Sequence, residues 1–509
     1  MGGLPLAFHK TKSPINAGRI PFMIVFHMAK SVKVNYVFNL INTAVGLLFP
    51  IVTFPYVTRV VMAEGLGRVQ FLSSIINYIT LLTALGIPLY AVREIARVRD
   101  NITERNKTTM EILILHVILC LVGYAIVFIL GITVTKIYND IGLFLLLSLH
   151  IILSAIGVSW FYQGVEDFGY ITIRSLIVRL LCLIALFTLV KSKDDLYIYA
   201  GVQVFSEVGN YLFNFFHLKK YISLKDIPWK ELNFKRHLPP ALKIFVLNLI
   251  TSIYVNLDSV MLGFLSTNVA LGFYSSVTRL TKALLGIVGT LGSVLLPRLS
   301  NYVYNGNIEA FKSTSNKAYN FILTMSIPMV FGLVISAPEL IKVMCGSEFA
   351  PAISTMQIVA PIILFIGASS FVGLQVLYSQ GKENLVVIST LVGAIINFTL
   401  NWILIPHWAQ DGAAIATTLA EFSVITTMFI IGRRYIPFNA LNKTFLQISI
   451  FSLLMVIPLF LVKQLPYSVY IIFLLEILVA TTIYLLLLLI TKNEFLTLVF
   501  ENVKKRINK

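Results

Sequence analysis

The apolar residues of this 509-residue chain occur in blocks of about 20, separated by short polar connections, and this spacing limits the possible folds more than any other feature. A helix of about 20 apolar residues crosses the roughly 30 Å of hydrocarbon in a bilayer. With 57% hydrophobic and 12% charged residues, the chain has about half the charged fraction of a soluble domain. Its longest polar connection, from about His217 to Pro240, is too short for a soluble domain. An integral membrane protein is therefore predicted.

The bilayer also determines the secondary structure of these blocks. Each span must satisfy its own backbone hydrogen bonds inside hydrocarbon, which favours helices, and the sequence lacks the short alternating segments typical of a β-barrel. We predict an all-α membrane fold of about 14 transmembrane helices. The predicted spans are residues 34–58, 69–92, 110–132, 140–162, 172–191, 196–217, 241–264, 272–297, 316–338, 354–378, 384–405, 411–432, 444–463 and 468–491.

Basic residues gather in alternate connections between the spans and so predict the orientation of the chain. Lys and Arg are enriched in cytoplasmic loops, so both termini are predicted to be cytoplasmic. The net charge of +17 therefore reports topology and does not indicate a nucleic-acid partner. The basic connections hold Arg93, Arg97, Arg99, Arg105, Lys107, Lys219, Lys220, Lys225, Lys230, Lys235, Arg236, Lys243, Arg433 and Arg434, together with the tail VKKRINK.

One short polar motif occurs twice, as QGVED at residues 163–167 and as QGKEN at residues 380–384. Both copies fall on the predicted cytoplasmic side, after spans 4 and 10. Spans 1–6 therefore match spans 7–12 as a parallel repeat about an axis along the membrane normal. The predicted divisions are a cytoplasmic segment (1–33), an N-lobe (34–217), a basic cytoplasmic linker (218–240), a C-lobe (241–432), a last helix pair (433–491) and a basic cytoplasmic tail (492–509).

The repeated motif has two interpretations, a pair of coupling carboxylates or a tight hairpin, and the hairpin is favoured. Gly164 and Gly381 suit the left-handed residue that ends a helix. Asp167 and Asn384 suit the N-cap of the next helix, where an adjacent glutamate favours the positive end of the dipole. The predicted hairpin residues are Gln163, Gly164, Glu166, Asp167, Gln380, Gly381, Glu383 and Asn384.

Several longer motifs resemble those of Wzx-type O-antigen or polysaccharide flippases, within the multidrug/oligosaccharidyl-lipid/polysaccharide exporter superfamily. The motifs are FPYVTRVVMAEGLGRVQF (54–71), GIPLYAVREIA (86–96), WFYQGVED (160–167), LDSVMLG (257–263) and GAAIATTLAE (412–421). The resemblance implies two six-helix lobes, an extra helix pair and a central cavity. It also implies passage of an undecaprenyl-diphosphate-linked oligosaccharide, such as an O-antigen, capsular or exopolysaccharide unit, from the cytoplasmic to the periplasmic leaflet by alternating access.

Polar residues inside the spans predict where that cavity lies, since ionisable groups in a bilayer are costly and usually functional. Ser275, Arg279 and Lys282 recur in span 8 at helical spacing and form one stripe. Span 2 has a milder stripe at Ser73, Asn77 and Thr80, and span 1 has Asn35, Asn39 and Asn42. Facing these stripes inward gives a polar cavity that is basic on its C-lobe side.

A basic cavity suits a diphosphate or an acidic sugar, because Arg and Lys pair strongly with phosphate oxygens. Arg279 and Lys282 are predicted to contact the diphosphate or the glycan, and Asp258 to tether one of them in the empty site. Arg59 either lines the cavity or extends to a headgroup. The predicted cavity residues are Arg279, Lys282, Asp258, Arg59, Asn77, Asn39 and Ser275.

The energy source remains open in the sequence, which lacks the GxxxxGK(S/T) phosphate loop of an ATPase. Glu207 and Glu421 occupy equivalent mid-span positions, and a carboxyl buried there is able to exchange a proton. These two glutamates are the candidates for ion coupling. No metal or other cofactor is predicted, since Cys120, Cys182 and Cys345 lack ligand spacing.

Three other functions are less consistent with the sequence. A drug exporter of the related MATE type shares the fold but should have an acidic cavity for organic cations. A membrane polysaccharide polymerase or glycosyltransferase should have a large extracytoplasmic loop, and a scaffold has no use for charges in so many spans. We therefore predict a non-enzymatic flippase of the bacterial inner membrane, in contact with membrane lipids and with a polymerase or chain-length regulator as a further candidate partner. The start at Met1 or Met28, the glycan and the oligomeric state stay open.

Overall fold

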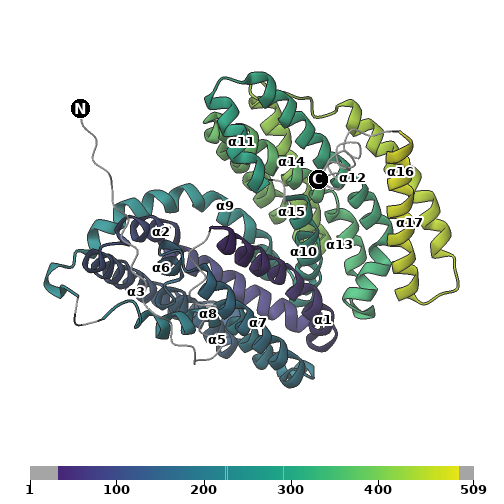
Figure 1. Ribbon diagram of the computed structural model, residues 1–509. Coiled ribbons are helices and arrows are strands. Elements are labelled where there is room, and N and C mark those ends of the chain that lie inside the picture. The colour runs from purple at the N-terminus through teal and green to yellow at the C-terminus, as the bar shows by residue number, and fades with distance from the viewer. Residues whose placement is uncertain (1–31, 224, 226, 290–291, 492–509) are drawn as a thin grey trace, which may run out of the picture.

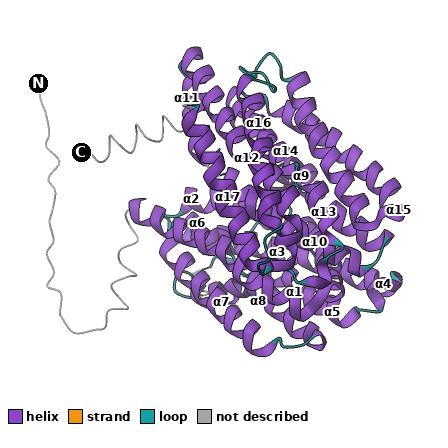
Figure 2. Cartoon of the chain, turned by 90° about the vertical axis from the view of Figure 1, so that its right-hand side faces the viewer, coloured by secondary structure: helices purple, strands orange, loops and turns teal. Residues whose placement is uncertain are grey.

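The computed structural model describes residues 32–223, 225, 227–289 and 292–491. This part of the chain is helical and contains no strand (Figure 2). Within it, nine segments are long and apolar enough to cross a membrane, and two of these, Ile51–Val98 and Glu383–Ile431, have 48 and 49 residues. Since about 20 residues span a bilayer, segments of this length exceed a single crossing. The predicted all-α membrane fold is confirmed.

The N-terminal helix group consists of the first eight α-helices and lies on one side of the molecule (Figure 1). The first helix breaks at Met62 (φ 62°), so predicted spans 1 and 2 lie on either side of that residue. Predicted span 4 is also broken, at Val158 (φ 36°), rather than continuous. The helices are α1 (Val32–Ala84), α2 (Ile87–Val98), α3 (Ile102–Thr133), α4 (Thr135–Tyr138), α5 (Ile141–Ile156), α6 (Ser159–Gly164), α7 (Phe168–Leu189) and α8 (Leu196–Leu218).

The C-terminal helix group begins with α9, which contacts both α1 and α15 and so borders both groups. Predicted span 10 is divided into α13, α14 and a π-helical turn, with Pro361 at the first break. Predicted spans 11 and 12 fall within α15, which breaks at Ala409. The helices are α9 (Leu238–Leu265), α10 (Asn268–Gly289), α11 (Gly292–Tyr304), α12 (Ile308–Met344), α13 (Ala352–Val359), α14 (Ile362–Ser370), η8 (Phe371–Leu377), α15 (Glu383–Ile431), α16 (Lys443–Lys463) and α17 (Val469–Ile490).

Short helical turns occupy several connections. They are η3 (Lys193–Asp195), η5 (Trp229–Glu231), η6 (Phe234–His237), η7 (Ser347–Phe349) and η9 (Tyr378–Gln380). The turns η5 and η6 lie in the basic connection between the two helix groups, where the longest polar stretch of the sequence falls. This connection is therefore partly structured.

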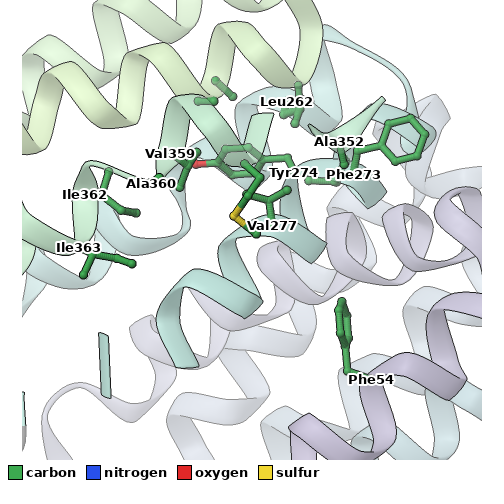
Figure 3. Packing of buried hydrophobic residues seen from close by; sticks show 14 of the residues in the cluster. Phe54, Leu262, Phe273, Tyr274, Val277, Ala352, Val359, Ala360, Ile362 and Ile363 are labelled. Carbon is green, nitrogen blue, oxygen red and sulfur yellow. The ribbon is translucent and has the colours of Figure 1, made fainter. Parts of the chain in front are cut away.

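The core of the C-terminal group is built around α10. Tyr274 and Val277 of α10 point toward Val359 of α13 and Ile362 of α14, while Phe54 of α1 approaches from the other helix group (Figure 3). All five side chains are buried and belong to one hydrophobic cluster. Helix α10 is therefore packed into its own group on one face and turned toward the N-terminal group on another.

The two groups meet most closely where α1 crosses the start of α10. A Cβ atom on Gly67 would overlap the carbonyl of Asn268, and one on Gly272 would overlap the carbonyl of Ala63. Only residues without a side chain allow two helix backbones to approach this far. We call this contact the glycine seal. It lies beside the break at Met62, at the end of the molecule that the sequence predicts to be extracytoplasmic, here called the outer end.

The repeated hairpin motif differs in detail from its prediction. Asp167 caps α7 by accepting a hydrogen bond from the backbone N–H of Tyr170 (3.3 Å). The left-handed residue of this copy is Glu166 (φ 59°) and not Gly164, whose Cβ would instead lie 2.7 Å from Ile95. Gly164 is therefore a packing requirement, because its helix lies against α2.

In the second copy Gly381 is left-handed (φ 66°), while Lys382 occupies the N-cap position predicted for Asn384. Glu383 lies in the first turn of α15. Gln380 donates hydrogen bonds from Nε2 to the carbonyls of Val376 (2.9 Å) and Tyr435 (2.9 Å). Gln163, in the first copy, accepts a backbone hydrogen bond from Glu166 (3.1 Å). Both motifs thus form turns, with different residues in the special positions.

The glycine seal generates a test by substitution. Gly272→Ala should lower the free energy of unfolding by about 1–3 kcal/mol, because the added methyl group must push α1 and α10 apart. The melting temperature of the purified protein measures this loss. Gly201→Ala in α8 is the matched control, since nothing lies within 4 Å of a Cβ at that position. Equal melting temperatures for the two variants would contradict the close contact.

Candidate functional site

Arg279 lies in a pocket between the two helix groups. Its side chain is exposed, and its guanidinium carbon lies 5.5 Å from the ring centre of Phe54 in α1. The predicted residue Ser275 lies in the same pocket, one helical turn earlier along α10. The pocket is lined by Phe54, Leu66, Val69 and Gln70 of α1, Tyr199 and Gln203 of α8, and Ser275, Ser276 and Arg279 of α10. One cation of the C-terminal group therefore faces a wall of the N-terminal group.

Lys282 follows Arg279 by three residues and is also exposed. Residues three apart on a helix lie on one face, so the two cations continue a single stripe along α10. Lys282 is not among the residues that line the Arg279 pocket. The stripe thus extends beyond the pocket, toward the end of α10.

A second pocket lies within the N-terminal group and holds two more of the predicted residues, Asn77 and Glu207. His150 Nδ1 lies 3.4 Å from Glu207 Oε2, and the Glu207 side chain is 48% exposed. Gln203 lines this pocket as well as the Arg279 pocket. The two pockets are therefore neighbours that share one side chain.

Asp258 is buried among neutral hydrogen-bond donors, which differs from the predicted tether. Its Oδ1 accepts from the side-chain amides of Asn397 (2.8 Å) and Asn401 (2.6 Å). Its Oδ2 accepts from the hydroxyls of Tyr274 (2.7 Å) and Thr417 (2.9 Å). Four donors satisfy the carboxylate, and within the described residues it forms no ion pair with Arg279 or Lys282. The predicted tether is therefore absent as an ion pair, although the charge of Asp258 acts on Lys282 through space.

The other predicted residues lie elsewhere. Arg59 donates to the carbonyls of Pro55 (2.6 Å) and Val343 (2.6 Å), so it binds the last turn of α12 rather than joining Arg279. Glu421 is buried within α15 and engaged by a neighbour. Asn39 lies in α1, but its side chain falls outside the described residues. The predicted cavity and coupling residues therefore do not all line one pocket.

An apolar groove of about 490 Å³ lies between α10, α12, α16 and α17. Leu284, two residues after Lys282, lines it, as do Met325 and Phe473. Glu476 is buried at its wall, 3.7 Å from Lys463, which also binds Glu339 (2.7 Å). The sequence pattern does not predict this groove.

A buried cluster fixes the basic connection to the N-terminal group. Glu111 of α3 is fully buried and accepts from the backbone N–H of Asn233 (2.7 Å) and from Arg236 Nε (2.8 Å). His237 Nε2 lies 2.8 Å from Glu111, and its Nδ1 lies 2.7 Å from the Tyr90 hydroxyl. Burial lowers the pKa of His237, and a neutral imidazole satisfies both bonds. The helical periodicity of the sequence does not predict this cluster.

Comparison with known proteins identifies related sequences. A family model described as "Polysaccharide biosynthesis protein" matches residues 32–303, more than half of the chain. A Shigella dysenteriae protein named "Putative O-antigen transporter" is 24% identical over 384 residues, which cover 75% of this chain and 95% of the relative.

Solved structures show a similar fold. "Lipid II flippase MurJ, inward closed conformation" has a TM-score of 0.71 at 16% identity and covers 91% of this chain and 99% of its own. An inward-facing multidrug resistance MATE family transporter of the MOP superfamily has a TM-score of 0.60 at 15% identity, covering 82% and 97%. These likenesses support the fold class predicted from the sequence.

The Asp258 cluster generates a stability test. Asp258→Ala removes the acceptor of four donors, three of them in buried hydrogen bonds, and should cost about 1–3 kcal/mol for each group that finds no new partner. Asp258→Asn, which keeps one acceptor oxygen, should lose less. Asp100→Ala is the control, because that side chain is 97% exposed. Melting temperatures of the three purified variants measure the order, and an Asp258→Ala protein as stable as the control would contradict the network.

Proposed function

This chain belongs to the polysaccharide biosynthesis protein family, and we propose that it acts as a flippase for a prenyl-diphosphate-linked oligosaccharide. The single observation that supports this most is the exposed cation Arg279 in a pocket between two groups of membrane helices. The cargo is proposed to be an undecaprenyl-diphosphate-linked repeat unit, moved from the cytoplasmic to the periplasmic leaflet. The fourteen predicted spans, the two lobes and the cytoplasmic termini form part of this proposal.

The physical task of such a protein is to shelter a polar headgroup from hydrocarbon. Burying an ionised phosphate without partners is far more costly than burying a neutral polar group. Arg279 and Lys282 offer two positive charges on one face of α10, and charge-assisted hydrogen bonds to phosphate are among the strong ones in proteins. The diphosphate is therefore proposed to bind along this stripe while the headgroup crosses.

The apolar groove between α10, α12, α16 and α17 suits the prenyl chain of the same cargo. It is lined mainly by aliphatic and aromatic side chains of α10, α12, α16 and α17. Leu284 brings α10 to one wall of the groove, but it is rotated by about 200° from Lys282 around the helix. A lipid bound by its diphosphate to the cation stripe would therefore have to pass its chain around α10 to reach this groove, where apolar burial favours it.

Transport by alternating access requires the closed end of the molecule to open. The glycine seal and the hydrogen bond from Lys136 Nζ to the Ser266 carbonyl (3.1 Å) join the two helix groups at the outer end. Arg59 and Thr58 add bonds from α1 to the last turn of α12. The structure is thus interpreted as a state closed on the outer side, from which release requires α1 and α10 to separate.

The coupling ion is part of the proposal. Glu207 and Glu421 remain candidates, and the Asp258 cluster is a third, because turning the amides of Asn397 and Asn401 would present their oxygens to a small cation beside the carboxylate. Transport in proteoliposomes at full rate without any ion gradient would exclude coupling at all three places.

The protein is inferred to be a transporter rather than an enzyme, located in the bacterial inner membrane, with a polymerase or chain-length regulator as candidate partners. The MATE-type alternative is less well supported, because the exposed charges on α10 are positive. An exporter of organic cations would gain nothing from Arg279 and Lys282 in that position.

The proposed cargo contact is tested at Arg279. Arg279→Ala should abolish surface polysaccharide in a strain that lacks the wild-type gene, because the diphosphate loses its partner, while the amount of protein in the membrane stays unchanged. Arg279→Lys should restore part of the signal, since it keeps the charge but not the bidentate geometry.

Arg434→Ala serves as the control, because Arg434 is exposed in the connection after α15 and outside both pockets. Surface polysaccharide is measured by immunoblot and membrane insertion by an epitope tag. Full polysaccharide from Arg279→Ala would refute the proposed role.

A further inference from the structure

The wall opposite Arg279 is polar in a way that membrane helices seldom are. On α1, Gln70, Ser73 and Asn77 recur at steps of three and four and therefore share one face. On α8, Gln203 and Glu207 stand four residues apart and share a face as well. Polar residues within spans usually mark a substrate pathway, because hydrocarbon offers them no partners.

These two faces form one continuous surface. The Arg279 pocket contains Gln70 and Gln203, and the neighbouring pocket contains Ser73, Asn77 and Glu207. Gln203 belongs to both pockets and joins them. We call the joined surface the polar track, and it consists of Gln70, Ser73 and Asn77 of α1, His150 of α5, and Gln203 and Glu207 of α8.

The track is chemically different from the wall it faces. Among the described residues that line the two pockets, Arg279 is the one Lys or Arg, and it belongs to α10. The track instead offers amides, a hydroxyl, an imidazole and a carboxylate, which together both donate and accept hydrogen bonds. Tyr199 adds an aromatic ring at the Arg279 end.

Part of this hydrogen-bonding capacity is unused within the protein. Within the described residues the buried Ser73 hydroxyl has no partner, and the half-exposed Glu207 carboxylate lies 3.4 Å from His150 Nδ1. Buried polar atoms without partners are uncommon and call for an explanation. A ligand with many hydroxyl groups would supply the missing partners.

We propose that the polar track binds the saccharide part of the cargo, while Arg279 and Lys282 bind its diphosphate. This inference rests on the proposed flippase function and adds a division of labour between the two helix groups. Uncharged hexose hydroxyls match the donor and acceptor mixture of the track, whereas they gain little from an isolated guanidinium. The polar track thus determines which glycan is accepted. Arg279 and Lys282 bind the diphosphate that all such lipids share.

The track is closed in this structure, since each of its two pockets has a volume of only about 10 Å³. From Gln70 to Asn77 the α1 face of the track extends for seven residues, or about 10 Å at 1.5 Å per residue. A face of this length contacts more than one hexose only after the two helix groups have separated. A site that hydrogen-bonds hydroxyl groups also discriminates strongly against cargo that lacks them, because its own polar groups are then left unpaired.

The test compares two lipids that differ only in their sugars. One is undecaprenyl diphosphate bearing a single sugar, and the other is the complete lipid-linked repeat unit, both extracted from the cells that make them. Binding to the full-length protein in nanodiscs is measured by microscale thermophoresis. Gln203→Ala should weaken binding of the complete unit about tenfold, the effect expected for one or two lost hydrogen bonds, and should change binding of the single-sugar lipid less than about twofold.

Asn77→Ala is a second, independent variant with the same expectation, and it keeps the test valid if Gln203→Ala fails to fold. Gln464→Ala is the matched control, because Gln464 is an exposed glutamine after α16, outside both pockets. Arg279→Ala should weaken binding of both lipids to a similar degree.

The outcomes separate the inference from the function on which it rests. Wild-type protein that binds neither lipid would overturn the proposed function itself. Wild-type protein that binds both lipids, with Gln203→Ala and Asn77→Ala changing neither affinity or both affinities equally, would overturn the saccharide role of the track alone. A selective loss for the complete unit would support it.

Discussion

The structure depends on a contact in which two helix backbones touch without side chains between them. Gly67 and Gly272 bring α1 against α10, and α10 is also the helix that bears the exposed cations. This contact closes the outer end of the interface between the helix groups. The Arg279 pocket is therefore separated from the outer side by the glycine seal. A single crossing therefore sets both the access to the cavity and the position of its charges.

Charged side chains within the spans have two contrasting environments. Asp258 is surrounded by four neutral donors from α10 and α15, so its charge is satisfied inside one helix group. Arg279 has the Phe54 ring beside it and remains exposed to the pocket. The Asp258 charge still acts on Lys282 through space, but within the described residues the carboxylate forms no ion pair with either cation. The positive stripe is thus left available for an anionic ligand, which fits a phosphate-bearing cargo.

Helical periodicity explains what the sequence could predict. Ser275 and Arg279 lie four residues apart, and the structure places both in one pocket, because residues at that spacing share a face. Periodicity says nothing about partners from distant helices. Asn397 and Asn401, about 140 residues after Asp258, were therefore missed, although two asparagines four apart in an apolar span are a usable signal. For a similar reason the sequence predicted Gly164, and not Glu166, as the left-handed residue of the first motif. The role of Gly164 depends on its contact with Ile95 of α2, which periodicity does not predict.

The buried Glu111 cluster limits how the two helix groups are able to move. Asn233, Arg236 and His237 attach the connection to α3 of the N-terminal group, almost to the first residue of α9. Removing one partner from a buried charged cluster is strongly unfavourable, so the connection should stay with the N-terminal group during transport. Any hinge between the groups then has to lie at or after the start of α9, where Pro239 and Pro240 occupy the first turn. The end of the connection, residues 233–237, should therefore move together with the N-terminal group.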